Sequence, residues 1–99
     1  MATYMILTKM TTEGAKQIKS WPEAIDGVLE RFEAMGGKTH GFYASGVLYD
    51  FIGIGEAPDD ETCEQFRRLL ESWGMVEAQV IRLFTKEEFD NLIEAIEID

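Results

Sequence analysis

The stretch GVLYDFIGIGEAPDD, residues 46–60, joins an apolar run to an acidic segment. Its β-branched and aromatic residues predict a strand over 47–57. Alternation along that strand places apolar side chains on both faces: Leu48, Ile52 and Ile54 on one, Tyr49 and Phe51 on the other. Both faces of the sheet that holds this strand therefore need a cover.

Outward from this stretch, the chain alternates strands and helices. Strands are predicted over 3–10, 38–45 and 75–84, and Ser45-Gly46 is a hairpin signal before the strand at 47–57. Helices are predicted within 20–37, over 58–74 and after Thr85, and the segment 11–20 reads as a loop or a broken helical turn.

The helix predictions rest on end signals and on apolar stripes. Ser20 with Glu23 and Thr85 with Glu88 have capping-box spacing, and Pro22 suits a first turn. Acidic residues crowd the start of the second helix, where the helix dipole favours them. The stripes are Ile25, Val28, Leu29, Phe32 and Met35 in the first helix, Cys63, Phe66, Leu69, Leu70 and Trp73 in the second, and Phe89, Leu92, Ile93 and Ile96 in the last.

This order predicts an α+β, ferredoxin-like βαββαβ fold with an added C-terminal helix. Right-handed crossovers place both main helices on one face of a four-stranded antiparallel sheet, which leaves the other face uncovered. A second subunit packed sheet to sheet is the expected cover, giving a homodimer or higher homo-oligomer. We expect the face that carries Tyr49 and Phe51 to form this interface.

Length and charge narrow the classes of partner. The 99 residues fit one domain, 1–99, and carry 19 acidic against 9 basic residues, a net charge of −10. Such a chain is a poor partner for nucleic acid or for an anionic membrane. No apolar run approaches the roughly 20 residues of a membrane span. The N-terminus reads as a strand and not as a signal peptide, and the single cysteine fits a reducing cytoplasm.

Four segments, in order and over nearly the full length, resemble the GYD domain family: MATYMILTKMTTEG (1–14), GGKTHGFYA (36–44), GVLYDFIGIGEAPDDE (46–61) and RLFTKEEF (82–89). The resemblance implies a member of the dimeric α/β-barrel group, in which two ferredoxin-like subunits press their sheets together. It implies no particular chemistry. A looser likeness joins the segment around Tyr49 to the effector-binding domains of leucine-responsive regulators, which bind small molecules at subunit interfaces, but this chain lacks their DNA-binding helix-turn-helix.

Two residues are candidates for catalysis. Asp50 is either a general base, with His40 on the neighbouring strand, or a structural residue whose carboxylate accepts backbone N–H bonds at the hairpin mouth. His40, the only histidine, is either a proton shuttle or a surface residue of the sheet.

Ligand binding is predicted for a second group of side chains. Aromatic residues dominate ligand pockets and also dominate cores and interfaces, so both roles stay open for them. An arginine on the last strand suits a carboxylate ligand or one of the many surface acids. The candidates are Tyr4, Trp21, Tyr43, Tyr49 and Arg82.

Several chemistries are not expected. One histidine and one cysteine are too few for a zinc site, so no metal is predicted. GIGEAP, residues 53–58, lacks the third glycine of a dinucleotide fingerprint and lies within a strand, so no cofactor is predicted either. Cys63 lies on a helix stripe with acids near it, which favours a core residue over a nucleophile.

Three functions remain open at this point. The favoured one is a homo-oligomeric small-molecule-binding or regulatory module with its site between sheet and partner subunit. The second is a cofactor-free enzyme of the oxygenase or isomerase type, for which His40, Asp50 and Arg82 supply the polar groups; it rests on fold analogy. The third is a structural subunit of a larger assembly, and a solidly filled barrel would favour it.

Overall fold

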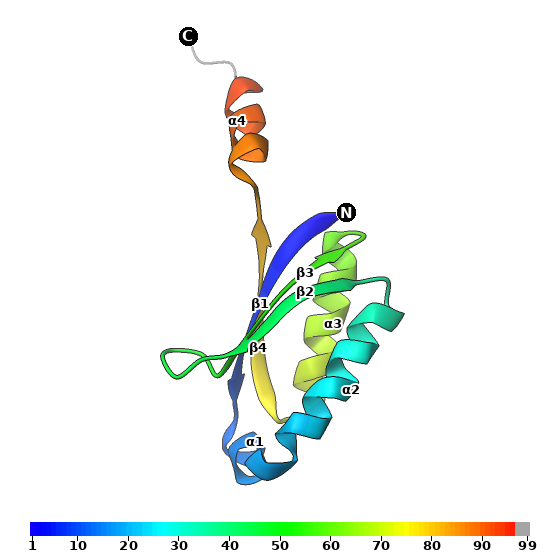
Figure 1. Ribbon diagram of the computed structural model, residues 1–99, viewed down its shortest axis with the longest axis vertical. Coiled ribbons are helices and arrows are strands. Elements are labelled where there is room, and N and C mark those ends of the chain that lie inside the picture. The colour runs from blue at the N-terminus through cyan, green and yellow to red at the C-terminus, as the bar shows by residue number, and fades with distance from the viewer. Residues whose placement is uncertain (97–99) are drawn as a thin grey trace.

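The architecture is ferredoxin-like, as predicted (Figure 1). The computed structural model describes residues 1–96. Its four strands form one antiparallel sheet in the order β2-β3-β1-β4. The elements are β1 (Ala2–Met10), α1 (Thr12–Lys16), the 3-10 turn η1 (Ile18–Ser20), α2 (Trp21–Ala34), β2 (Lys38–Ala44), β3 (Phe51–Ala57), α3 (Asp60–Ser72), β4 (Val76–Leu83) and α4 (Lys86–Glu94).

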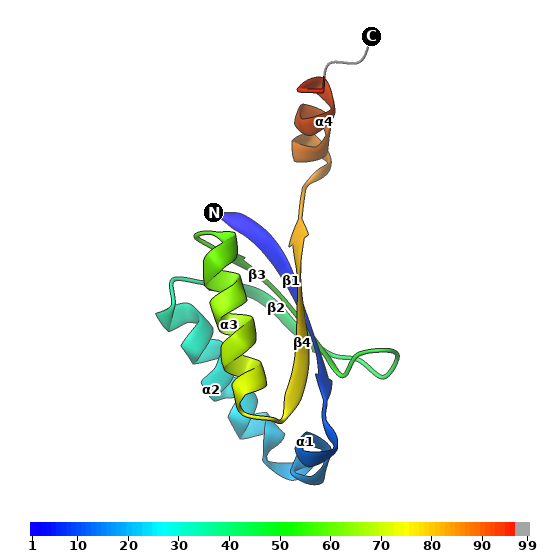
Figure 2. The ribbon, with the colours of Figure 1, turned by 180° about the vertical axis from the view of Figure 1, so that it is seen from behind.

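Helices α2 and α3 lie side by side on one face of the sheet, as Figures 1 and 2 show from opposite sides. The core fills the space between these helices and the sheet. Phe32 of α2 and Phe66 of α3 meet there with ring centroids 5.0 Å apart. The buried cluster consists of Tyr4, Phe32, Ala57, Cys63, Phe66, Leu70, Val76 and Ala78. The helix stripes predicted at Phe32 and Phe66 are therefore core-facing, and the opposite face of the sheet is open.

The predicted capping box at the start of α2 is wrong. Ser20 makes no side-chain cap; its hydroxyl donates to the carbonyl of Gln17 at 2.8 Å. The reason is local backbone, because Ser20 ends the turn η1 with φ −90° and ψ −7° and lacks the extended conformation that a cap residue needs. Pro22 does occupy the first turn, as expected.

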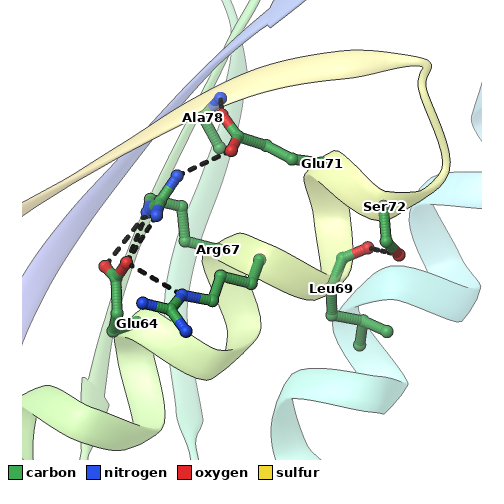
Figure 3. A network of polar contacts seen from close by, with 7 residues as sticks. Glu64, Arg67, Leu69, Glu71, Ser72 and Ala78 are labelled. Carbon is green, nitrogen blue, oxygen red and sulfur yellow. Dashed lines mark hydrogen bonds and ion pairs between the residues drawn. The ribbon is translucent and has the colours of Figure 1, made fainter.

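Helix α3 protects the free edge of the sheet. Its N-cap is Asp59, whose carboxylate accepts the N–H of Thr62 at 2.8 Å. Near its other end, Glu71 accepts the backbone N–H of Ala78 on edge strand β4 at 3.0 Å. Arg67 lies between Glu64 and Glu71 and holds the latter in place (Figure 3). An edge strand with a paired N–H is a poorer template for aggregation.

Helix α4 extends away from the body of the subunit (Figures 1 and 2). Its predicted capping box is confirmed: Thr85 and Glu88 bond each other's backbone N–H, each at 3.0 Å. Because of this arm the radius of gyration is 15.5 Å, against about 13 Å for a compact chain of this length. The last apolar stripe is about half exposed throughout: Phe89 51%, Leu92 47%, Ile93 45% and Ile96 54%.

The hairpin before β3 is longer than predicted. It occupies 45–50, and β3 begins at Phe51, not at Val47. Leu48 has a φ of +67°, which a non-glycine residue rarely adopts and which breaks the alternation of faces. The prediction that Tyr49 and Phe51 lie on the same face of one strand was therefore wrong.

The expectation that Phe51 shares the uncovered face with Tyr49 was accordingly wrong, and the interface itself stays a prediction. Phe51 lies under the helices, where its ring stacks on Trp21 with centroids 5.3 Å apart. Ile52 and Ile54 lie on the open face instead, beside Leu7 and Met5 of β1. The period-of-two argument still holds within β3 itself.

Candidate functional site

The open face of the sheet has an apolar centre. Its side chains come from the three strands β3, β1 and β4, which the register places next to one another. Met5, Ile52 and Ile54 are half-buried and Ile81 is 43% exposed. Leu7 lies on the same face, between Met5 and the end of the strand. We call these five side chains the open-face patch: Met5, Leu7, Ile52, Ile54 and Ile81. In the described part of the chain no helix covers it.

Charged side chains flank this patch at both ends of the strands. Lys9 is the register partner of Glu77 at one end, and Lys38 is the partner of Glu56 at the other. His40 Nε2 lies 2.7 Å from the Glu56 carboxylate, and both side chains are partly exposed. An apolar centre with a polar rim is the anatomy of a protein interface.

Two of the predicted ligand residues lie on this side of the sheet. Tyr49 leaves the hairpin and donates its hydroxyl to Gln79 Oε1 at 2.8 Å. Leu7, the register partner of Gln79, is only 7% exposed, so the open face is partly shielded at this point. Tyr43 on β2 is 59% exposed and lies against Gly41.

Asp50 braces two segments of backbone. Its carboxylate accepts the N–H of Met10 at 2.7 Å, and its own N–H donates to the carbonyl of Thr8 at 2.9 Å. The carboxylate therefore accepts a backbone N–H, the kind of bond that its structural interpretation requires. The donor belongs to β1, however, and not to the hairpin.

Tyr4, Asp60 and Arg82 form a polar cluster beside the core. The Tyr4 hydroxyl donates to Asp60 Oδ1 at 2.5 Å, and Arg82 Nη1 lies 3.5 Å from the same oxygen. Arg82 also lies over the rings of Tyr4 and Phe84, 5.7 and 4.8 Å from their centroids. Burial, reinforced by the Asp60 carboxylate, raises the pKa of Tyr4 to about 12. The cluster ties β1, α3 and β4 together.

Cys63 is fully buried below this cluster. Burial, with the Asp60 and Asp59 carboxylates, raises the pKa of its thiol to about 11. At neutral pH the thiol is therefore protonated and weakly nucleophilic. The site geometry agrees with the prediction of a core residue.

The predicted site residues do not converge on one point. Tyr4 and Trp21 lie on the helix side of the sheet, whereas Tyr43, Tyr49 and His40 lie on the open side. His40 is near one end of β3 and Asp50 precedes the other, roughly 15–20 Å away by strand rise. Arg82 is three strands away from His40 across the sheet, roughly 14 Å. No shared cavity brings His40, Asp50 and Arg82 together among the described residues.

Sequence reasoning missed three functional neighbours. Gln79, Glu56 and Asp60 hold Tyr49, His40 and Tyr4, respectively. The contacts of Gln79 and Glu56 with Tyr49 and His40 follow only from how the strands pair. That pairing could not be predicted from the sequence, because it depends on the geometry of the hairpin. Asp60 was recognised as a first-turn acid of α3, but nothing in its spacing indicated Tyr4, 56 positions away.

Residues 1–96 contain no group of three or more histidine, cysteine, aspartate or glutamate side chains arranged to hold a metal ion. In the same range, no helix is both long enough and apolar enough to cross a bilayer.

The GYD domain family model matches residues 4–93, from β1 through most of α4. The chain belongs to the GYD domain family. A search of curated proteins finds no match. In this GYD domain, the matched region contains the sheet except the first two residues of β1, together with the open-face patch, the Tyr4 cluster and the capping box of α4.

Proposed function

We propose that this GYD domain is a homo-oligomeric small-molecule-binding or regulatory module whose site lies between the open face of the sheet and a second copy. The observation that carries the proposal is the open-face patch. Four of its side chains, Met5, Ile52, Ile54 and Ile81, keep a substantial part of their surface in water. Burying each aliphatic side chain fully is worth about 1.5–3 kcal/mol.

The size of the surfaces supports a second copy as the cover. Four strands of about seven residues span roughly 20 Å by 20 Å, or about 400 Å². A stable interface uses about 800 Å² per partner, so the sheet alone falls short. Helix α4 carries a second half-exposed apolar stripe, which adds to the surface that a second copy can cover. A two-fold axis lets each copy offer both surfaces at once.

The polar rim supports the same arrangement. The register partners Lys9 and Glu77 lie at one end of the patch and Lys38 and Glu56 at the other, so both signs of charge are present at the edge for a two-fold related copy to meet. Tyr43 and Tyr49 stand beside the patch and offer aromatic surface with hydroxyl groups, the usual lining of a ligand site.

Native mass spectrometry tests both halves of this proposal. The parent chain is expected to appear as a dimer or higher oligomer that carries the additional mass of a small molecule. Ile81→Glu places a charge in the patch and is expected to give a bare monomer. Ile18→Glu is the matched control, since Ile18 is 57% exposed in η1, away from the patch, and it should leave the oligomer intact.

Two results would contradict the proposal in different ways. A monomeric parent chain at micromolar concentration, seen also by light scattering, would remove the second copy. An oligomer with no bound small molecule, from several preparations, would retain the assembly and favour a structural subunit.

A further inference from the structure

We infer that each subunit holds a second ligand site, a cavity between α2, α3 and the sheet that takes a small single-ring aromatic molecule. This site lies on the helix side of the sheet, opposite the open-face patch. It belongs wholly to one chain, so it does not depend on the proposed function. The cavity has a volume of about 80 Å³.

The wall of the cavity is aromatic. Trp21, Phe51 and Phe42 stack in a row, with centroids 5.3 Å apart for the first pair and 5.6 Å for the second. Phe32 and Phe66 line the cavity as a tilted pair. Aromatic pairs are stabilised by the geometry of their rings as well as by the burial of their area, so a planar ring finds favourable edges and faces here.

Glycine 53 is the reason that the space exists. It lies on the helix side of β3, and a Cβ built on it meets only Phe42, at 3.9 Å, an ordinary contact. Gly55, two residues further on the same face, has no such room, because its Cβ would lie 2.7 Å from the carbonyl of Lys38. A side chain at position 53 was therefore sterically possible, and glycine there leaves the cavity empty.

One polar atom beside the cavity indicates that the ligand carries a hydrogen-bonding group. Thr39 lines the cavity, and its hydroxyl oxygen is buried and has no hydrogen-bond partner among the described residues. An unpaired buried hydroxyl is unfavourable and gains most from a donor or acceptor placed beside it. An aromatic ring with one hydroxyl, such as phenol, supplies both the apolar body and that group.

The cavity also has a way in. A surface groove of about 380 Å³ shares Trp21, Val28, Trp73 and Met75 with it. Trp73 follows α3, is 43% exposed and precedes Gly74, whose φ is +73°. An engineered apolar cavity of about 150 Å³ binds benzene. The smaller cavity here accepts a ring because the adjoining groove extends it.

Titration of the full chain with phenol and with toluene tests the inference. The two tryptophans of the chain, Trp21 and Trp73, both line the cavity, so binding should change tryptophan fluorescence saturably. NMR shifts should concentrate on the methyl groups of Ile6, Val28, Leu70 and Val76, and spare Ile81 on the open face.

Gly53→Val fills the cavity and should weaken both probes about tenfold or more, while the chain stays folded. Gly46→Ala is the matched control: it lies in the hairpin, away from the cavity and the groove, with nothing within 4 Å of its Cβ, and affinity should not change. Thr39→Val should weaken phenol about tenfold, the effect expected of one lost hydrogen bond, and leave toluene unchanged.

The absence of saturable binding in the parent chain, or equal affinity in Gly53→Val, would overturn the site. Equal loss of phenol and toluene in Thr39→Val would overturn the role of the hydroxyl. Ile81→Glu separates this inference from the proposed function: phenol should still bind the monomeric variant, whereas a site between subunits would be lost.

Discussion

Helices α3 and α4 begin in the same way and end in different surroundings. Each has a side-chain N-cap, two acidic residues in its first turn and one apolar stripe. The α3 stripe is buried, since Cys63, Phe66 and Leu70 are 0–4% exposed, whereas Phe89 of α4 is 51% exposed. An amphipathic pattern therefore shows that a helix face needs a cover, but not which chain provides it.

The largest difference between the two helices should appear on truncating one phenylalanine in each. In the Ile81→Glu background, Phe66→Ala should lower the free energy of unfolding by about 3–5 kcal/mol, since it leaves a cavity in the core. Phe89→Ala should change it by less than about 0.5 kcal/mol. Chemical denaturation measures both. Equal losses would mean that α4 packs on its own subunit.

Alkaline pH should loosen the attachment of α3. In the folded chain Cys63 keeps its proton to a pKa of about 11, against 9.0 ordinarily, and Tyr4 to about 12, against 10.0. The unfolded chain loses these protons first, so their stabilisation is complete below pH 9 and is lost as pH rises through the folded values. Each of the two groups contributes about 2–3 kcal/mol to the free energy of unfolding, and this contribution is lost once the group is deprotonated in the folded chain as well.

Urea denaturation followed at several pH values checks this dependence. Cys63→Ala should delay the onset of the loss to about pH 10, where Tyr4 alone begins to act. The α4 stripe carries no titratable side chain, so the variant Phe89→Ala should show the same alkaline profile as the parent. Stability that stays constant from pH 9 to pH 11 would contradict the burial of both groups.

The carboxylate of Glu71 anchors α3 to β4, and α4 has no equivalent contact with the sheet among the described residues. Glu71→Ala should cost about 1–3 kcal/mol by leaving the N–H of Ala78 unpaired, and Glu71→Gln less, since an acceptor oxygen remains. Asp50→Ala, which frees the N–H of Met10, is a matched comparison of similar size. Thermal melts rank the variants. An alanine variant as stable as the parent would leave its carboxylate free for another role.

The smallest contrast concerns the two caps. Asp59→Ala should cost about 1 kcal/mol of global stability, because α3 melts only with the core. Thr85→Ala removes an equally good cap but should only fray α4, which circular dichroism would detect as lost helix without a shift of the main transition. A shared shift in both variants would show that the helices unfold as one unit.

Element order, helix stripes and the Thr85 cap were all predictable from the sequence. Each depends on side chains a few positions apart, so local spacing is enough to identify them. The hairpin was not, because a positive φ at Leu48 has no sequence signal comparable to that of glycine. The hairpin around Leu48 leaves the start of β3 at Phe51, and Tyr49 and Phe51 lie on opposite sides of the sheet.

The candidate site was less predictable than the fold. Aromatic residues were chosen for their type, and the structure divides them between two sides of the sheet. Thr39 and Gly53 were not chosen, because an unpaired hydroxyl and an unfilled space are properties of the packing and not of the residues. The bond from Tyr4 to Asp60 depends on contact between residues far apart in the chain.

The central position of β1 in the sheet affects the rate of folding. The strand nearest the N-terminus pairs with β3 on one side and with β4 on the other, and Thr3 faces Leu83 across 80 positions. During synthesis, β1 therefore waits with an unpaired edge until the last strand emerges. Closing so large a loop is entropically unfavourable, and mixed α/β chains with such long-range pairing fold more slowly than helical bundles. The nascent chain therefore passes through a stage in which one edge of β1 has no native partner.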